Sequence, residues 1–294
     1  PMDGILCLDK PQEMTSFSCC AVFRRLLGVK KIGHAGTLDP MATGVLPLLV
    51  GRATRALELL PDHNKRYTAV LRFGFVSDTQ DVWGAVTPTG GAPPSRCAVE
   101  EALTAFRGEI LQVPPMMSAL KKDGVRLYDL ARQGVEVERE ARPVTIHSLS
   151  LLGYDEAAGE LTLDCACSKG TYIRTLCADL GEALGCGAVM TALRRTMAAG
   201  YSLEQCVTLD QARALAAEGS LPGRLMPVDS AFSACGAVTV SPAQAARFRN
   251  GGALALDRLP RKAAGLTRVY APDGAFLGLG RPSEGELKIT RLFV

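Results

Sequence analysis

One loop combines the residue types best suited to chemistry, residues 33–44 with the sequence GHAGTLDPMATG. Its three glycines and Pro40 predict a loop, and Pro40 favours an extended backbone at Asp39. Asp39 is the single carboxylate of this segment. A stiff loop that presents one acid suits an active site, whereas an aspartate in a Gly/Pro loop taken alone is more often a turn former.

Arg174 and two tyrosines, Tyr67 and Tyr172, are the next candidates for chemistry. Arg174 follows a strand-to-helix junction and falls in the first turn of a predicted helix. A cation there opposes the helix dipole, so a nearby carboxylate would stabilise it. The alternative interpretation is an ordinary surface arginine.

Other chemistries find little support in the sequence. No Ser/His/Asp triad is indicated, and no GxxxxGK[ST] phosphate loop occurs, which argues against nucleoside triphosphate chemistry. The three histidines are far apart and the ten cysteines include no Cys-x-x-Cys pair, so no metal site is expected. Residues 36–40 are superficially similar to aspartyl-phosphate phosphatases, but Met41 stands where those enzymes need a second carboxylate.

Hydrophobic periodicity and helix-capping signals predict the elements that must position these residues. Strands are predicted over residues 4–9, 45–50, 65–73, 143–154, 160–168 and 190–196. Helices are predicted over 16–27, 52–60, 95–106 and 208–219, with one more between the 168–175 junction and Gly185.

Residues 109–142 differ from this pattern and predict an insertion that leaves the main body. The segment begins extended and continues into a short helix over 127–133. Four basic residues cluster in it: Lys121, Lys122, Arg126 and Arg132. The two interpretations are an arm that grips a ligand and an ordinary excursion with solvated charges.

Length and charge favour two domains, residues 1–236 and 237–294, with 220–236 as a linker. The 294 residues are 47% hydrophobic, enough for a substantial core. The last segment is rich in short strands and carries a net charge of +5, which leaves −2 for the rest of the chain. A basic terminal module on a near-neutral body favours a polyanionic partner, although a solvated basic face fits equally well.

The chain is expected to be cytoplasmic and to have no membrane partner. No apolar run is long enough to span a bilayer, and residues 4–9 form a strand pattern rather than a secretory signal. The ten cysteines are scattered, which is typical of reduced thiols in a protein core.

The loop at 33–44 resembles the signature loop of the TruB family of tRNA pseudouridine synthases. The resemblance covers essentially the whole chain, because the other family blocks follow in the same order. These blocks are residues 9–11, 65–67, 77–81, 115–121, 168–175 and 193–195.

The resemblance implies an isomerase that converts uridine 55 in the T-loop of tRNA to pseudouridine. The C1′–N1 bond breaks, the uracil rotates and a C1′–C5 bond forms, so no cofactor is implied. It also implies an α+β fold with a large mixed, mainly antiparallel sheet flanked by helices. Residues 237–294 would form a small β-barrel-like, RNA-binding module of the PUA type.

The resemblance also assigns roles to residues of the catalytic domain. Asp39 is implied as the catalytic carboxylate, paired with Arg174. Tyr67 is implied to stack on the uracil and to handle the proton released at C5. Tyr172 and Leu193 are implied to contact the base, although Leu193 would otherwise pass as a core residue.

Further residues are implied in RNA binding. The target base is stacked inside a folded loop, so it must be flipped out to reach Asp39. His34 is similar to the family residue that stacks where the bases leave. Lys10 is implied to contact the site by supporting the catalytic loop, and the 109–142 arm, with Lys121 and Arg132, is implied to clamp the T-stem and loop.

Two alternatives come from other functional classes. The first is a guide-RNA-dependent relative that works inside a ribonucleoprotein; the intact arm and the absence of long charged tails argue against it. The second is an RNA-binding or RNA-folding protein without catalysis; the presence of Asp39, Tyr67 and Arg174 argues against it. Nothing in the sequence indicates oligomerisation, so a monomer is expected.

Overall fold

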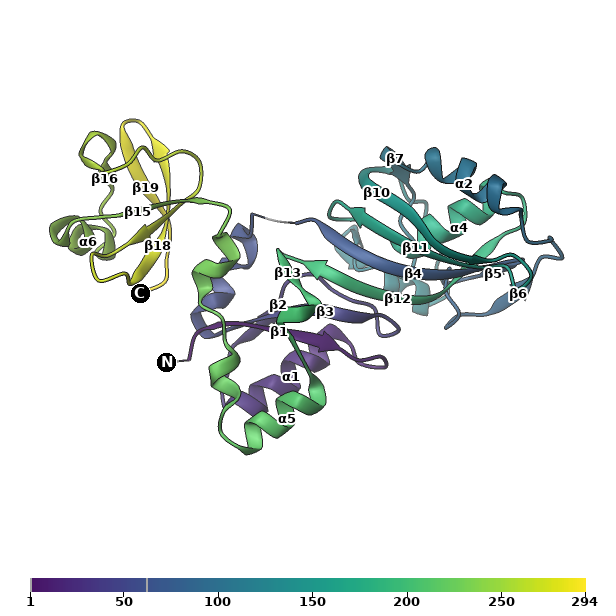
Figure 1. The fold of residues 1–294 in the computed structure, drawn as a ribbon, viewed down its shortest axis with the longest axis horizontal. Helices are drawn as coiled ribbons and strands as arrows, with labels where there is room; N and C mark the ends of the chain where they lie inside the picture. The colour runs from purple at the N-terminus through teal and green to yellow at the C-terminus, as the bar shows by residue number, and fades with distance from the viewer. Residues whose placement is uncertain (1, 62) are drawn as a thin grey trace.

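The computed structural model describes residues 2–61 and 63–294, which fold around one large and one small β-sheet (Figure 1). Within those residues the large sheet has ten strands, in the order β14-β1-β3-β12-β4-β11-β10-β7, with β13 on β12 and β2 on β3. The β1–β14 and β3–β12 pairs are parallel and the other pairs of this sheet are antiparallel. The predicted mixed, mainly antiparallel sheet is confirmed.

The elements of the main body follow the predicted order. The strands of the large sheet are β1 (Gly4–Lys10), β2 (Ile32–His34), β3 (Thr43–Val50), β4 (Lys65–Phe73), β7 (Gly108–Gln112), β10 (Arg142–Asp155), β11 (Glu160–Cys167), β12 (Ala188–Ala198), β13 (Tyr201–Ser202) and β14 (Cys206–Thr208). The helices are α1 (Ser16–Leu27), α2 (Arg96–Thr104), α4 (Ile173–Ala183) and α5 (Leu209–Ala217). A 3-10 helix spans Gly51–Leu59, and β5 (Phe75–Ser77) and β6 (Val86–Pro88) form a separate hairpin.

Local sequence signals explain where α1 begins and ends. The Thr15 hydroxyl accepts the Ser18 N–H at the N-terminus, and Gly28 ends the helix in the left-handed region with φ +64°. The buried face of α1, which includes Cys19 and Phe23, packs into the main core. This packing fixes the first residue of the helix, Ser16, beside the loop at 33–44.

The C-terminal module is a curled five-stranded sheet of the order β15-β17-β18-β19-β16, counted within the described residues. Its elements are β15 (Gly236–Thr239), α6 (Pro242–Arg249), β16 (Leu254–Ala255), β17 (Thr267–Tyr270), β18 (Phe276–Ser283) and β19 (Glu286–Leu292), with a 3-10 turn at Leu256–Arg258. Figure 1 shows it set apart from the large sheet. A shared apolar cluster joins the two, with Ile5 and Leu49 from the body and Leu279 and Phe293 from the module.

The predicted linker at 220–236 is packed rather than free. It contains 3-10 turns at Leu221–Arg224 and Val228–Phe232. Met226 exchanges two backbone hydrogen bonds with Ile5 of β1, both 2.8 Å long, and Phe232 is completely buried. Proline and glycine here set the turns of a packed connection, which the sequence pattern did not distinguish from a loose one.

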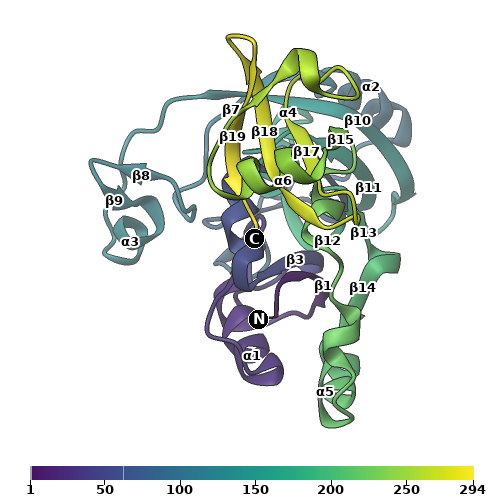
Figure 2. The same ribbon diagram turned by 90° about the vertical axis from the view of Figure 1, so that its left-hand side faces the viewer.

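The 109–142 segment is not separate from the body over its full length. β7 pairs with the first residues of β10 and forms one edge of the large sheet, so the chain leaves the sheet only between 113 and 141. That part carries β8 (Lys121–Lys122), β9 (Val125–Arg126) and the short helix α3 (Leu127–Arg132). Figure 2 shows it extending to one side of the body. We call residues 113–141 the arm.

The cysteines are free thiols, and most are buried. Cys97 is exposed and Cys206 and Cys235 are partly exposed, so the prediction that all ten lie in the core is wrong for these three. Within the part of the chain that the structure describes, no helix is long and apolar enough to cross a membrane.

Candidate active site

Ser16 holds the backbone of the residue that precedes Asp39. Its hydroxyl donates to the Leu38 carbonyl at 3.1 Å and accepts the Leu38 N–H at 2.9 Å. Ser16 is buried, so neither bond competes with water. The first turn of α1 is therefore connected directly to the loop at 33–44, which carries Asp39.

Lys10 supports the other side of the loop from the end of β1. Its ammonium donates to the carbonyls of Pro11 at 2.7 Å, Met14 at 2.8 Å and Pro40 at 3.4 Å. The residue is completely buried, and burial lowers the pKa of Lys10 to about 8. Its three donors are occupied by protein carbonyls, so Lys10 lies behind the loop rather than on a surface that faces substrate.

Arg195 of β12 ties both ends of the loop together. Its guanidinium donates to the carbonyls of Gly36 at 2.9 Å, Thr37 at 3.4 Å and Val45 at 2.8 Å. It is completely buried. Gly44 allows this approach, because a Cβ there would lie 2.1 Å from the Arg195 carbonyl oxygen.

Arg195 belongs to the family block at 193–195, but the sequence alone predicted no role for it. The available signal was its position two residues after Leu193 on the same strand, which places both side chains on the same face of the sheet.

Asp39 and Arg174 form the predicted ion pair. Arg174 Nε lies 3.0 Å from Asp39 Oδ2. The arginine side chain is only 5% exposed, whereas that of Asp39 is 40% exposed. The acid is thus open to an approaching ligand while its partner is fixed inside the protein.

Both Nη atoms of the Arg174 guanidinium also donate hydrogen bonds. Nη1 donates to the Thr79 carbonyl at 3.2 Å and Nη2 to the Met117 carbonyl of the arm at 2.9 Å. Arg174 therefore contacts three segments at once: Asp39 of the 33–44 loop, the 77–81 turn and the arm.

Asp81 is a second carboxylate near Arg174 that sequence analysis gave no role. Its Oδ2 lies 4.0 Å from Arg174 Nε, and its Oδ1 accepts the Thr79 hydroxyl at 2.8 Å and the Trp83 N–H at 2.9 Å. It is buried. The polar run at 77–81 was the signal, but its pattern also fits a solvent-exposed turn.

Tyr67 and Leu193 lie on one face of the sheet below the loop. Tyr67 of β4 pairs with Arg195 of β12, and Leu193 pairs with Ala69. Tyr67 is 6% exposed and Leu193 is 8% exposed. Burial raises the pKa of Tyr67 to about 12, so its phenol stays protonated at neutral pH.

Tyr172 is fixed through its backbone at the start of α4. The Gln112 side chain donates to the Tyr172 carbonyl at 3.1 Å and accepts its N–H at 3.0 Å. Burial raises the pKa of Tyr172. Gln112 is buried at the end of β7 and was not identified from the sequence.

His34 ends β2 at the beginning of the loop. Its Nδ1 is buried and has no hydrogen-bond partner among the described residues. Burial and the positive charge of Arg195 lower the pKa of His34. The ring is therefore a neutral, partly covered surface beside the loop.

The predicted RNA-binding residues of the arm, Lys121 and Arg132, lie on β8 and α3. Lys121 is exposed on β8. Arg132 ends α3, where its guanidinium lies 5.3 Å from the centre of the Tyr128 ring. Both lie in the arm, which Figure 2 shows to one side of the body.

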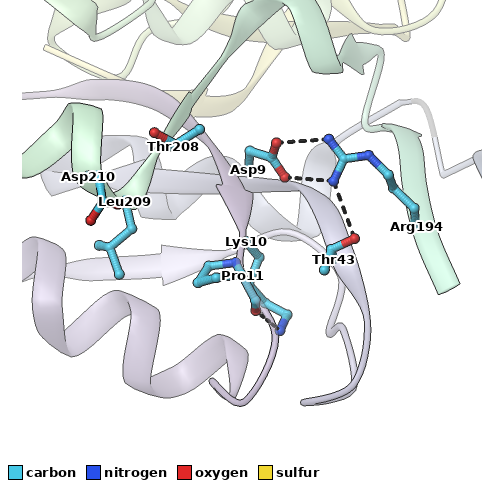
Figure 3. Close-up of a pocket in the computed structure, with 8 residues that line it drawn as sticks. All are labelled: Asp9, Lys10, Pro11, Thr43, Arg194, Thr208, Leu209 and Asp210. Carbon is cyan, nitrogen blue, oxygen red and sulfur yellow. Dashed lines mark hydrogen bonds and ion pairs between the residues drawn. The ribbon is translucent and has the colours of Figure 1, made fainter. Parts of the chain in front are cut away.

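A shallow pocket of about 290 Å³ lies beyond Lys10, away from Asp39 and Tyr67, neither of which lines it (Figure 3). Arg194 crosses it with a two-pronged ion pair to Asp9, at 2.8 and 3.1 Å, and a 3.2 Å bond to the Thr43 hydroxyl. Its walls are Asp9, Lys10, Pro11, Thr43, Arg194, Thr208, Leu209 and Asp210. The ion pair links β12 to β1, and the bond to Thr43 links β12 to β3 at the end of the 33–44 loop.

Solved structures share the fold of this chain. The structure titled "Crystal Structure of a Cbf5-Nop10-Gar1 Complex" superposes with a TM-score of 0.76 at 24% identity, covering 100% of this chain and 85% of that chain. The one titled "Structure of H/ACA RNP bound to a substrate RNA containing 2'-deoxyuridine" gives 0.74 at 22%, covering 99% and 85%. These likenesses confirm the predicted pseudouridine synthase fold.

Family models match nearly the whole chain. "TruB family pseudouridylate synthase (N terminal domain)" matches residues 24–173, "tRNA pseudouridylate synthase B C-terminal domain" matches 174–233 and "Pseudouridine synthase II TruB, C-terminal" matches 236–293. The molecule is a pseudouridine synthase, an isomerase.

Within that class, the chain belongs to the TruB family. It is 47% identical over 292 residues to the "tRNA pseudouridine synthase B" of Aromatoleum aromaticum, covering 99% of this chain and 92% of that relative. The protein of the same name from Dechloromonas aromatica is 47% identical over 286 residues, covering 97% and 93%.

Proposed function

We propose that this enzyme isomerises uridine 55 in the T-loop of tRNA to pseudouridine, acting as a monomer with Asp39 as its catalytic carboxylate. The observation that carries the proposal is the Asp39–Arg174 ion pair of 3.0 Å, in which the acid is exposed and the arginine is buried. The 47% identical relatives carry the name tRNA pseudouridine synthase B, which supports tRNA as the substrate class.

The chemistry needs an ionised acid in a fixed place. The C1′–N1 bond breaks, the uracil rotates, a C1′–C5 bond forms, and the proton lost from C5 balances the one gained at N1. A carboxylate serves by adding to the sugar or base, or by removing a sugar proton. All three routes require Asp39 to be charged, and the Arg174 guanidinium 3.0 Å away is its counter-ion.

Tyr67 contributes a protonated phenol below the loop. With its pKa raised to about 12 by burial, the hydroxyl can accept the C5 proton only as it passes its own proton on. Its ring offers a stacking surface for the uracil, worth roughly 1–3 kcal/mol per base. Leu193 and Tyr172 complete the apolar surface on which the extruded base would lie.

The uridine reaches this surface only if the covering groups move. Tyr67 and Leu193 are each less than one-tenth exposed, and the Met117 carbonyl of the arm is bonded to Arg174. We therefore assign the arm as the element that adjusts when RNA binds, and the T-stem and loop as what it grips. The flipped base then replaces the covering contacts.

Release of tritium from tRNA labelled at uridine C5 tests the proposal, with purified enzyme and unmodified tRNA as the sole macromolecules. We expect release from wild-type protein, and none when uridine 55 is replaced by cytidine. Asp39→Asn should abolish turnover while its affinity for tRNA remains. Asp210→Asn, at a carboxylate whose side chain is 95% exposed, is the matched control and should be fully active. Turnover by Asp39→Asn would exclude the mechanism.

A further inference from the structure

Lys65 places a cation beside the catalytic loop. It begins β4, two residues before Tyr67, so both side chains lie on the same face of the sheet. Its side chain passes over Gly36: a Cβ on this glycine would lie 3.2 Å from Lys65 Cε and 3.7 Å from Nζ. Gly36 has φ +82°, which a glycine adopts without strain.

The cation has no carboxylate partner in the part of the chain that the structure describes, and the titratable group next to it is the buried thiol of Cys167, its cross-strand neighbour on β11. No carboxylate lies within ion-pair distance of Lys65, and its ammonium makes no hydrogen bond to a described residue. Burial and the charge of Arg195 lower the pKa of Lys65. A partly buried ammonium without a partner is energetically unfavourable, and an anion would relieve the cost.

The neighbouring basic residues do not compensate for this. Arg195 Nη1 lies 3.4 Å from the same Gly36 Cβ position, so two positive groups flank the glycine. Among the described residues, Arg195 donates to three backbone carbonyls and contacts the Tyr67 hydroxyl, and Lys10 donates to three backbone carbonyls, so neither forms an ion pair with a carboxylate. Arg66, the next residue of β4, points to the opposite face and is neutralised by Asp164 at 2.8 Å. The side of the loop next to Lys65 therefore carries uncompensated positive charge.

We propose that Lys65 binds a backbone phosphate directly adjacent to the uridine that reacts, and so sets the position of that nucleotide along the protein loop at 33–44. The inference rests on the proposed function and adds a phosphodiester-binding group to it. Gly36 and Asp39 are three residues apart, so their Cα atoms are at most about 11 Å apart. This upper limit allows one nucleotide to place its sugar at Asp39 and its phosphate over Gly36. Phosphate contacts of this kind fix register, while the pocket reads the base.

The test is a double-mutant cycle in which one change is made in the protein and the other in the RNA. T-arm RNAs carry a single methylphosphonate on the 5′ or the 3′ side of the target uridine, which removes one charge at a time. Wild-type, Lys65→Gln, Lys65→Arg and Arg66→Gln enzymes are compared by kcat/KM on these RNAs and on unmodified RNA. Arg66→Gln removes a neighbouring cation from the opposite face and is the matched control.

On unmodified RNA, Lys65→Gln should lower kcat/KM by about 10- to 100-fold, as expected for a charged hydrogen bond. Lys65→Arg should recover most of this loss, and Arg66→Gln should show none. One of the two methylphosphonate RNAs should lower the kcat/KM of the wild-type enzyme by a similar factor. On that RNA, the kcat/KM of Lys65→Gln should equal that of wild type.

An equal loss for Lys65→Gln on all three RNAs, or no loss on any, would overturn the inference. Thermal unfolding of the Lys65→Gln and Arg66→Gln proteins separates loss of binding from loss of fold, because loss of fold would lower the unfolding midpoint of Lys65→Gln well below that of wild type, whereas removal of an unpaired buried charge should not. If the wild-type enzyme made no pseudouridine in unmodified RNA, the proposed function itself would fail, and this outcome is distinct from the others.

Discussion

The loop at 33–44 and the arm differ in how firmly buried contacts fix them to the rest of the protein. The loop around Asp39 is fixed by three buried polar side chains, Ser16, Lys10 and Arg195. In the arm at 113–141 the buried apolar side chains among the described residues are Pro114 and Pro115, next to the sheet, and Leu127. The basic residues Lys121, Lys122 and Arg126 of the arm are exposed. Both are irregular segments rich in turn residues, so composition alone does not distinguish them.

Under the proposed function, this difference corresponds to a division of work in which the loop carries the reacting group and the arm binds the RNA. A catalytic group must keep its geometry before the substrate arrives, and buried hydrogen bonds to the loop backbone provide this. A gripping element must adapt to the substrate, which requires few buried contacts and a low cost of rearrangement. Arg174 is the point where the two meet, because it bonds Asp39 on one side and the Met117 carbonyl on the other.

Breaking that junction should have the largest effect. Arg174→Lys keeps the charge but replaces a planar fork by one rotating ammonium, which cannot serve Asp39, Thr79 and Met117 together. We expect kcat/KM in the tritium-release assay to fall by about 100-fold or more.

The control for this change is Arg96→Lys, which alters an exposed Arg96–Glu100 pair on α2 and should have no effect. Full activity of Arg174→Lys would show that the loop and the arm do not depend on this arginine.

Removing a loop support should come next. Ser16→Ala leaves the Leu38 N–H and carbonyl buried without partners, which should lower the free energy of unfolding by about 1–3 kcal/mol. Because the loop loses its contact with α1, kcat should fall while KM changes little. Urea unfolding and steady-state kinetics measure the two effects.

Ser18→Ala, two residues later on the same helix, loses only solvent-exposed hydrogen bonds and is the matched control. If both serine variants behaved alike, the buried Ser16 contacts would have no special part in positioning Asp39.

Weakening the arm should act on binding instead of chemistry. Lys121→Ala combined with Arg132→Ala should raise KM for tRNA about tenfold with kcat retained, if each residue contacts one phosphate. The slope of log affinity against log salt should also decrease by about 1.5. A control that removes Arg96 and Arg213, both exposed on body helices, should leave the slope unchanged. A fall in kcat with unchanged KM would contradict the comparison.

The local elements were predictable because their signals are local. Thr15 and Gly28 bound α1 as the sequence indicated, and the alternation of β4 placed Tyr67 inward. The family blocks led to the Asp39–Arg174 pair, which the structure contains.

The supports of the site were not predictable, because they join residues distant in sequence. Gln112 reaches the Tyr172 backbone across 60 residues, Arg174 reaches Thr79 across 95, and Arg195 reaches Gly36 across 159. Periodicity tells which face a strand residue occupies, but not which backbone it will meet there. The same reason explains the arm boundary: the pairing of β7 with β10 depends on sheet order, which local pattern does not give.

The smallest expected effect is on the pH dependence of stability, and it comes from the buried ammonium of Lys10 that supports the loop. Burial lowers the pKa of Lys10 to about 8 in the folded protein, against 10.5 for a free lysine, so the unfolded chain binds more protons between these values. Stability therefore rises with pH in this window, and the contribution of Lys10 to the free energy of unfolding should grow by about 1 kcal/mol between pH 7 and pH 9. Urea unfolding of wild-type and Lys10→Met proteins at both pH values isolates this contribution, since Met does not titrate. An equal pH dependence of the two proteins would mean that burial does not destabilise the charged form of Lys10. The loop would then be fixed without a larger electrostatic free-energy cost than the arm.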